Sequence, residues 1–337
     1  LTSSDHPKAL DTKALGAAAP RDLVVREETV CSRALEQTLA ALQPGEHLCI
    51  AGSLHLVARA REFFNLPYER EGISEEVALE SLECIEMACR NRAMESRRVS
   101  ENGQVLCVTQ RGRPRYFMRN KHPFNDYVGA RLAEDKGYQY ELFSQAGLPV
   151  PFSLQVFNPL ADARFDRYKT PPSVAAICAE VERCFSYPLV VKKYRSSVSQ
   201  GVYLEFNQED LQRRLQNLFE HSSYSDNILL IQAYVKGPEY RMVASQDELL
   251  LAYEKQDEEG PGREDLNPLH QASGQAVKVE DPALLQPMRE LASAVAEVVD
   301  LGFYAVDLIR AEDHFYILEI NPNPFCFFYN RDNDRAD

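Results

Sequence analysis

The sequence predicts a mixed α/β and α+β protein with two or three compact domains, and three observations support this prediction. With 337 residues and 45% hydrophobic content, the chain can bury more than one sizeable core. Stretches with helical periodicity alternate with short apolar runs bounded by Gly, Pro and polar residues. Near the end, two strand-forming runs, residues 303–310 and 315–321, flank a short polar turn, which predicts a β-hairpin.

The charge balance limits the partners of the protein. The chain has 37 Lys and Arg against 51 Asp and Glu, a net charge of −14. Such a chain repels a phosphate backbone, so we expect no nucleic-acid partner and only small, locally enclosed phosphates. No apolar run approaches the roughly 18 residues that cross a bilayer, and the first residues lack the plan of a signal peptide. We therefore expect a cytoplasmic protein without a membrane partner, and a homodimer is compatible with the sequence.

The N-terminal third has the alternation of an α/β domain. Residues 1–20 are rich in Ala, Ser and Lys and predict a flexible arm. Helical and strand signals then alternate through residues 21–118, which we interpret as one domain. The expected helices are residues 32–42, 54–65 and 74–95, and the expected strands are residues 47–51, 105–109 and 116–118.

The predicted hairpin brings acidic side chains together. A three-residue loop, residues 312–314, would place Asp307 directly opposite Glu319, with Cβ atoms roughly 5 Å apart. Side chains alternate along a strand, so Glu319 and Asn321 would share this face while Leu318 and Ile320 point into a core. Two carboxylates and an amide oxygen suit Mg²⁺. A solvated acidic face explains the same pattern, and from this stretch alone both interpretations stay open.

A second stretch has the pattern of a phosphate-binding loop. A buried strand, residues 188–191, ends on Lys192, and residues 202–206 form the return strand. The turn between them offers hydroxyls and backbone N–H groups, which can close over the phosphates of a nucleotide. It is not a Walker loop, which opens a helix after GK[ST]. An ordinary hairpin loop is the alternative. The hydroxyls and the glycine of the turn are Ser196, Ser197, Ser199 and Gly201.

Three further stretches complete the pattern. A helix expected over residues 124–146 contains Lys136, which by itself predicts only a solvated lysine. The apolar strand at residues 228–231 runs into a linker whose backbone amide and carbonyl groups can read an adenine edge. The acidic Gly/Pro loop at residues 256–275 predicts either a lid or a disordered surface loop. Residues 281–302 predict a helix beneath the hairpin.

Four motifs in chain order resemble the ATP-grasp superfamily: DK…AGLPVP, PLVVKK…SSVSQGV, ILLIQAYVKGPEYR and AVDLIR…YILEINPNP. The resemblance covers residues 120–325 and is nearest to D-alanine-D-alanine ligase-like carboxylate-amine ligases. It implies the ATP-grasp fold, in which two α+β subdomains bind ATP between them. These subdomains would be residues 119–227 and 228–337, and the N-terminal domain precedes them in the chain.

The resemblance also implies roles for individual residues. The phosphates of ATP would contact Lys136, Lys192, Lys255 and the loop with Ser196, Ser197, Ser199 and Gly201. The adenine linker would be Gln232, Tyr234 and Val235, with Glu239 beside the ribose. Two Mg²⁺ ions, or Mn²⁺ in their place, would be held by Asp307, Glu319 and Asn321. Arg241 would steady a carboxylate or a tetrahedral intermediate, and we group Arg241 with Lys255 as catalytic.

The implied activity is that of an ATP-dependent carbon–nitrogen ligase. Such an enzyme forms an amide through an acyl phosphate and releases ADP and phosphate, here from small carboxylate and amine substrates such as amino acids or short peptides. Ala305 stands where D-alanine-D-alanine ligases carry an Arg, so D-alanine is not carried over as the substrate. An ATP-grasp phosphotransferase and a catalytically weak nucleotide-binding regulator are the alternatives.

Overall fold

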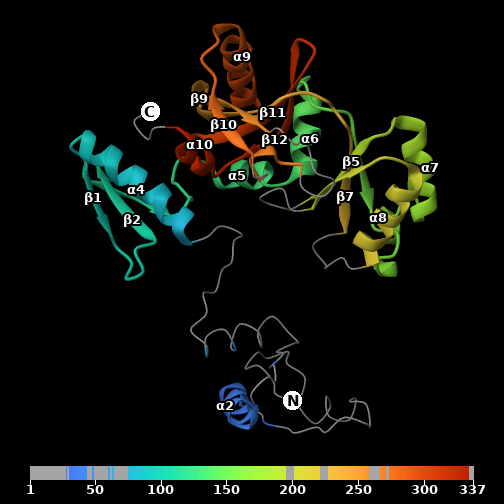
Figure 1. Ribbon diagram of the computed structural model, residues 1–337, viewed down its shortest axis with the longest axis horizontal. Coiled ribbons are helices and arrows are strands. Elements are labelled where there is room, and N and C mark those ends of the chain that lie inside the picture. Colours follow the sequence, from blue (N-terminus) through green and yellow to red (C-terminus); the bar gives the residue numbers. More distant parts are fainter. Residues whose placement is uncertain are drawn as a thin grey trace. The chain divides into compact units, whose positions relative to one another are not determined.

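The computed structural model describes residues 28, 30–43, 48, 60, 63, 75–194, 201–220, 227–257, 266–270 and 273–333 (Figure 1). The chain forms two compact units, Leu1–Ile73 and Ser74–Asp337. In the first unit, α2 (Cys31–Ala41) confirms the helix expected over residues 32–42. The predicted arm lies outside the described residues, and so do most of the strand and the helix expected between residues 47 and 65.

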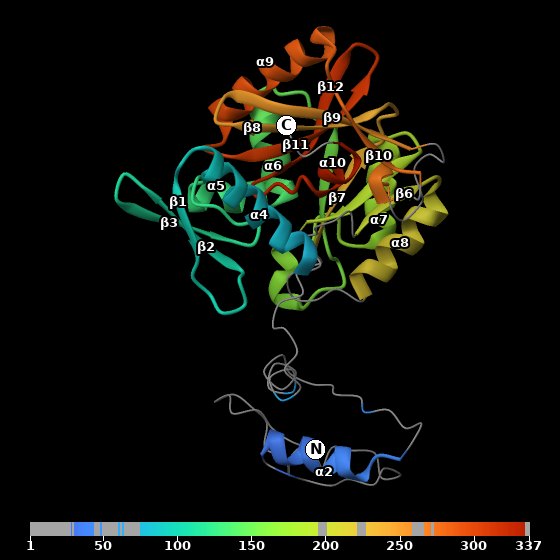
Figure 2. The ribbon, with the colours of Figure 1, turned by 60° about the vertical axis from the view of Figure 1, so that its left-hand side comes forward.

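The second unit begins with a helix on a small antiparallel sheet. The helix is α4 (Glu75–Asn91), and the strands, in the order β1-β2-β3, are β1 (Glu95–Arg98), β2 (Val105–Gln110) and β3 (Arg113–Met118). Figure 2 shows α4 lying along the sheet, where Leu82 and Cys89 pack against Leu106, Val108 and Phe117. The strands expected at residues 105–109 and 116–118 are confirmed as β2 and β3, although β3 begins three residues earlier. The strand β1 was missed because its sequence, ESRR, is wholly polar.

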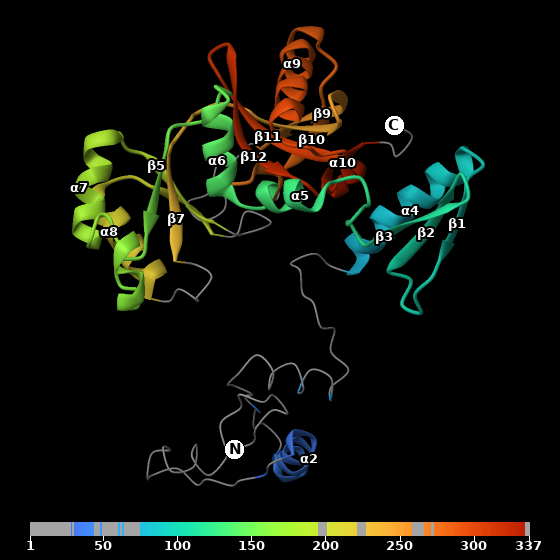
Figure 3. The same cartoon turned by 180° about the vertical axis from the view of Figure 1, so that it is seen from behind.

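The next sheet has four strands and helices on one face. In the order β4-β7-β5-β6, its strands are β4 (Ser153–Phe157), β7 (Ile228–Ala233), β5 (Leu189–Lys193) and β6 (Val202–Glu205). Figure 3 shows α7 (Val174–Cys184) and α8 (Gln208–Glu220) on the same side of these strands. Alternate residues such as Val191 and Ile231 pack against those helices. The other face therefore carries Lys192 and Gln232. A short 3₁₀ helix, η1 (Ala163–Tyr168), follows β4.

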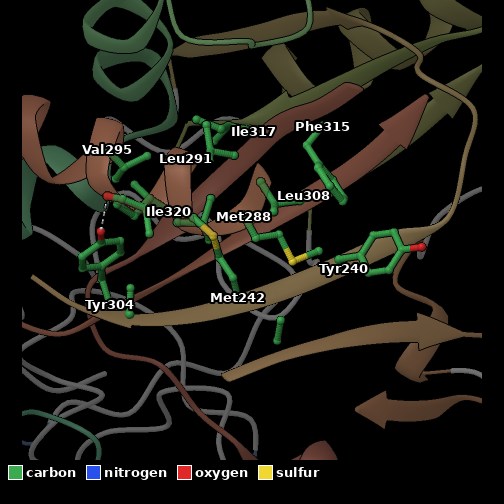
Figure 4. Close-up of a cluster of buried hydrophobic side chains, with 14 of the residues drawn as sticks. Tyr240, Met242, Met288, Leu291, Val295, Tyr304, Leu308, Phe315, Ile317 and Ile320 are labelled. Carbon is green, nitrogen blue, oxygen red and sulfur yellow. Dashed lines mark hydrogen bonds between the residues drawn. The ribbon is translucent and has the colours of Figure 1, made fainter. Parts of the chain in front are cut away.

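The last sheet has five strands and the largest core. In the order β10-β9-β8-β11-β12, the strands are β10 (Gln275–Lys278), β9 (Glu248–Gln256), β8 (Glu239–Ser245), β11 (Tyr304–Ala311) and β12 (His314–Asn321). The helix α9 (Pro282–Val298) covers one face, and Figure 4 shows Met288, Leu291 and Val295 of that helix against Leu308 and Ile317. On the opposite face, η2 (Pro268–His270) and α10 (Phe327–Asp332) cover β9 and β10.

The helix expected over residues 124–146 is two helices. They are α5 (Tyr127–Ala133) and α6 (Lys136–Gln145). The break occurs because the Asp135 side chain accepts hydrogen bonds from the backbone N–H groups of Gly137 and Tyr138, which caps a new helix. As a result, Lys136 is the first residue of α6, and α6 packs against α9 and β12.

The change from one sheet to the other falls in residues 234–238, between β7 and β8. The subdomain boundary expected at residues 227/228 is placed too early. It would separate β7 from its own sheet, in which β7 pairs with both β4 and β5. The mixed α/β and α+β class expected from the sequence is confirmed.

Candidate active site

A cleft lies between the inner faces of the four-stranded and five-stranded sheets. Its free volume, including the part open to solvent, is about 740 Å³, within the range of small-molecule sites. Each sheet contributes one lysine and several apolar side chains, α6 contributes a third lysine, and the β7–β8 linker also lines the cleft. The residues around the cleft are Lys136, Val190, Lys192, Val202, Gln232, Ala233, Tyr234, Val235, Glu239, Lys255, Leu266, Asn267, Asp307, Ile309, Leu318 and Glu319.

The hairpin places Asp307 opposite Glu319, but through a different turn from the one expected. Ala311 pairs with His314, so the turn has two residues, and Glu312 adopts a φ of 54° there. This register alone would move Glu319 away from Asp307. A bulge between Asp307 and Leu308 restores the Asp307–Glu319 pair.

The bulge also corrects the expected position of Leu318. Leu318 lines the cleft together with Glu319 instead of pointing into the core. The core positions of β12 are taken by Ile317 and Ile320. A bulge puts two residues of one strand opposite one residue of its partner, so the strict alternation assumed from the sequence fails at this point.

Asp307 is the centre of the charge network. Its side chain is 6% exposed and forms a bidentate pair with Arg241, with distances of 2.7 Å to Nε and 2.6 Å to Nη2. Lys255 Nζ lies 2.8 Å from the same carboxylate. Burial by itself raises the pKa of Asp307, but the two cations outweigh it and hold the pKa well below its usual range. Asp307 is therefore ionised at neutral pH.

Glu319 is held by a cation from another element. Lys136 Nζ lies 3.2 Å from the Glu319 carboxylate. Burial opposes ionisation, but Lys136 outweighs it and the pKa of Glu319 is lowered. The Asn321 amide lies within 3.3 Å of Asp307 and 3.5 Å of Glu319, so all three predicted metal-binding residues meet.

Burial in the cleft disfavours the charged forms of Lys192 and Glu239. Within the described residues, no carboxylate forms an ion pair with Lys192, and burial lowers its pKa to about 8. Glu239 lies 3.6 Å from Lys255, yet burial raises the pKa of Glu239. Both groups would gain from a ligand that brings phosphates to Lys192 and hydroxyls to Glu239.

Lys192→Ala is expected to weaken ATP binding about ten- to hundredfold, since a charge-assisted hydrogen bond contributes about 1.5–3 kcal/mol. Phosphates favour the charged lysine, so ATP binding should take up a proton above about pH 8 and weaken as the pH rises further. Calorimetry in two buffers of different ionisation enthalpy measures both effects. Lys193→Ala is the matched control, because the next residue of a strand points to the other face. Equal affinity of both variants would remove Lys192 from the site.

The β7–β8 linker offers free backbone groups. Within the described part of the chain, Tyr234 and Val235 make no backbone hydrogen bond beyond the strand ladders, so their amide and carbonyl groups remain available to an adenine edge. The Gln232 side chain is 4% exposed and donates to Ser153 Oγ at 3.0 Å, so it supports the linker from within the sheet. A Cβ on Gly237 would overlap the Arg310 carbonyl oxygen, so the linker needs a glycine to pack against β11.

The expected phosphate loop is described only at its ends. Ser196, Ser197 and Ser199 lie outside the described residues. Gly201 closes the loop with a φ of +76°, and its carbonyl accepts from the Lys193 amide at 2.8 Å. The expected lid at residues 256–275 is likewise described in part, and its residues Leu266 and Asn267 line the cleft.

Gln139 and Tyr194 position the site and were not found from the sequence. Gln139 is 7% exposed and forms two hydrogen bonds with the backbone of Ile320, the residue between Glu319 and Asn321. Tyr194 packs so closely on α6 that a Cβ on Gly137 would overlap its ring. A glutamine three residues after a helix start gives no signal of this contact, because its partner is 181 residues away.

Gln139→Leu should lower both stability and activity. It leaves the Ile320 amide and carbonyl without their partner, and each unpaired buried group costs about 1–3 kcal/mol. Urea unfolding should show a loss of a few kcal/mol, and turnover should fall because Glu319 and Asn321 lose their support. Gln216→Leu on the exposed face of α8 is the control. A variant as stable and active as this control would contradict the positioning role.

The chain beyond Asn321 is held by the segment before α5. Pro322 O accepts hydrogen bonds from Asn125 at 2.6 Å and contacts His122 Nε2 at 2.9 Å, while Asn120 donates to Asn323 O at 3.2 Å. These contacts fix the strand end that carries Asn321. Ala305, which replaces an expected arginine, is fully buried between Val243 and Asn321.

The cleft is electrically suited to a polyanion with a hard cation. Four cations (Lys136, Lys192, Lys255 and Arg241) stand against three carboxylates (Glu239, Asp307 and Glu319), a net charge of +1 in a chain of −14. Among the described residues, no group of three or more His, Cys, Asp or Glu forms a metal cage. Two carboxylates and an amide fit Mg²⁺ that takes its other ligands from phosphates and water. In the described part of the chain, no helix is long and apolar enough to cross a membrane.

Comparisons with known proteins identify the family. The RimK-like ATP-grasp domain family matches residues 164–333, half of the chain. The uncharacterized protein MG012 of Mycoplasma genitalium is 22% identical over 203 residues, 59% of this chain and 64% of that protein. A ribosomal protein bS6–L-glutamate ligase of Escherichia fergusonii is 24% identical over 212 residues, 62% of each chain. The chain thus matches less than two thirds of the length of these relatives.

Among solved structures, the D-alanine–D-alanine ligase of Bacillus anthracis complexed with ATP superposes with a TM-score of 0.43 and 20% identity, over 60% of this chain and 58% of that one. The family match covers half of the chain, including the hairpin, the β7–β8 linker and three of the four cations of the cleft. The protein belongs to the RimK-like ATP-grasp family.

Proposed function

We propose that this protein is an ATP-dependent carboxylate–amine ligase that forms an amide through an acyl phosphate and releases ADP and phosphate. The observation that carries the proposal is the cleft lined by three lysines, Lys136, Lys192 and Lys255, of which Lys136 pairs with Glu319 and Lys255 with Asp307. This arrangement suits the terminal phosphates of ATP, where a carboxylate would attack. The names of the bacterial relatives are consistent with such a reaction.

Different residues of the cleft would bind the nucleoside, the phosphates and Mg²⁺. The β7–β8 linker and Glu239 would bind the nucleoside, and the three lysines would bind the phosphates. Asp307, Glu319 and Asn321 would hold Mg²⁺, which supplies charge neutralisation at the phosphate oxygens. Arg241 and Lys255 lie 2.8 Å or closer to Asp307, and we assign them as the catalytic cations that offset developing negative charge.

The proposed reaction has two steps, each a nucleophilic displacement. A substrate carboxylate oxygen attacks the γ-phosphorus and the bond to ADP breaks. The amine then attacks the acyl carbon, phosphate leaves with the bonding electrons, and the amine loses a proton. Shielding of the acyl phosphate from water falls to the lid, of which Leu266 and Asn267 line the cleft.

Hydroxylamine tests the proposal, since this small amine traps an acyl phosphate as a hydroxamate. The protein, ATP and Mg²⁺ would be screened with amino acids and short peptides, with L-glutamate included because relatives carry its name. ADP together with a hydroxamate supports the ligase. AMP as the product contradicts the assigned site, and ADP with a stable phosphorylated product indicates a phosphotransferase.

One observation favours a second candidate, a nucleotide-binding regulator. Both oxygens of Asp307 are engaged by Arg241 and Lys255, so a metal ion must compete with these cations. A regulator would bind ATP and gain thermal stability but form no product with any acid in the screen.

A further inference from the structure

A pocket separate from the cleft lies between α4, the segment that follows β3, and the chain around α10. Its free volume, including the part open to solvent, is about 820 Å³, and it shares no lining residue with the cleft. Its apolar walls include the rings of Phe117, Phe124, Phe303 and Phe327. No Asp or Glu is among the described residues that line it. The proposed reaction uses none of these side chains, so the pocket needs an explanation of its own.

One wall of the pocket contains two buried hydrogen-bond acceptors. The Asn120 side chain is 9% exposed, and its Nδ2 donates to Asn323 O at 3.2 Å, which leaves Oδ1 as an acceptor. His122 Nε2 lies 2.9 Å from Pro322 O and must donate, because a carbonyl only accepts. Burial lowers the pKa of His122, so the ring is neutral and Nδ1 is an acceptor. Neither Oδ1 nor Nδ1 receives a hydrogen bond from the described residues, and buried acceptors without a donor are rare. A ligand that donates N–H groups here would complete this wall.

Arg119 and Lys121 bring positive charge to the same pocket. A tight turn, in which Lys121 N–H donates to Met118 O at 2.8 Å, places these two cations on either side of Asn120 in the chain. Both side chains are hydrogen-bond donors that suit a carboxylate. The net charge of −14 on the whole chain disfavours a ligand with net negative charge, and the two cations disfavour a ligand with net positive charge. The charges therefore favour a ligand that is neutral overall and has both a donor end and an acceptor end.

We propose that this pocket binds an α-amino acid with a large apolar side chain. The ammonium group would donate to Asn120 Oδ1 and His122 Nδ1. The carboxylate would accept from Arg119 and Lys121, and the side chain would lie against the phenylalanine rings. A zwitterion fits because it has both kinds of hydrogen-bonding group and no net charge. The proposal concerns binding alone and does not rest on the proposed ligase activity.

Calorimetric titration of the full chain with L-phenylalanine, in the absence of ATP, tests the proposal. L-Phenylalanine should bind at a single site, and three compounds that each lack one of its features should bind at least about tenfold more weakly. Phenethylamine lacks the carboxylate, 3-phenylpropanoate lacks the ammonium group, and glycine lacks the apolar side chain. Absence of saturable binding of L-phenylalanine, or equal affinity for any of the three compounds, would overturn the proposal.

Two cysteines that line the pocket, Cys84 and Cys326, report where the amino acid binds. Saturating L-phenylalanine should slow the alkylation of both thiols by N-ethylmaleimide at least about fivefold, since reaction requires access to the sulfur. Mass spectrometry of the peptides measures the rates in the wild-type protein. Cys184 is exposed at the end of α7 and should react at the same rate with and without the amino acid. An amino acid bound in the ATP cleft would protect neither Cys84 nor Cys326, and this result would contradict the assignment.

Two variants test the pocket from opposite sides. Cys84→Phe fills the pocket from α4 and should weaken binding of L-phenylalanine at least about tenfold. Cys184→Phe is the matched control, because it makes the same change at an exposed cysteine, and it should bind as the wild type does. Lys121→Met removes one charge without adding bulk and should weaken binding about threefold. Equal affinity of Cys84→Phe and Cys184→Phe, or wild-type affinity of Lys121→Met, would refute the proposed site.

Discussion

Glu319→Gln is expected to lower ATP turnover by about a hundred- to thousandfold while the protein stays folded. The change removes one of two carboxylates of the proposed Mg²⁺ site and the negative partner of Lys136, which lies 3.2 Å away. The side chain is 28% exposed, so the loss of its charge empties no core position. Release of ADP with the best substrate of the screen, and the melting temperature, measure the two effects.

Glu312→Gln is the matched control for this variant. It makes the same chemical change in the same hairpin, but Glu312 is exposed in the turn, away from the cleft. We expect wild-type turnover from it. If Glu319→Gln in saturating Mg²⁺ turned over as fast as this control, Glu319 would not be a metal ligand and the proposed role of the hairpin would be refuted.

Arg241→Ala should cost about 3–5 kcal/mol of the free energy of unfolding. The variant leaves the buried carboxylate of Asp307 with Lys255 as its cation, and breaking a buried pair by removing one partner has a cost of this size. Urea unfolding at neutral pH measures it. Arg241→Ala/Asp307→Asn should recover part of the loss, because it also removes the uncompensated charge.

Arg98→Ala is the comparison for Arg241→Ala. Arg98 makes a similar bidentate pair with Glu86, but both side chains are more than 20% exposed, so the expected cost is about 0–1 kcal/mol. If Arg241→Ala and Arg98→Ala lost the same free energy of unfolding, burial would not strengthen the Asp307 network. Loss of activity from Arg241→Ala with full stability would favour a purely catalytic role.

The sequence by itself determined the local elements and the chemical character of the site. Apolar periodicity located α4 and α9 to within a few residues, because their buried faces repeat at helical spacing. Two runs of strand-forming residues around a polar turn located the hairpin, because this pattern is also local in the sequence. The order of the four motifs identified the ATP-grasp superfamily, since motif order along a chain does not depend on tertiary contacts.

Only the tertiary structure decided how these elements meet. The bulge that keeps Asp307 opposite Glu319 and turns Leu318 into the cleft depends on the pairing of two strands, which no local preference specifies. The engagement of Asp307 by Arg241 and the support of Ile320 by Gln139 join residues 66 and 181 positions apart. Such contacts follow from the packing of whole sheets and helices, so a single sequence carries no local sign of them.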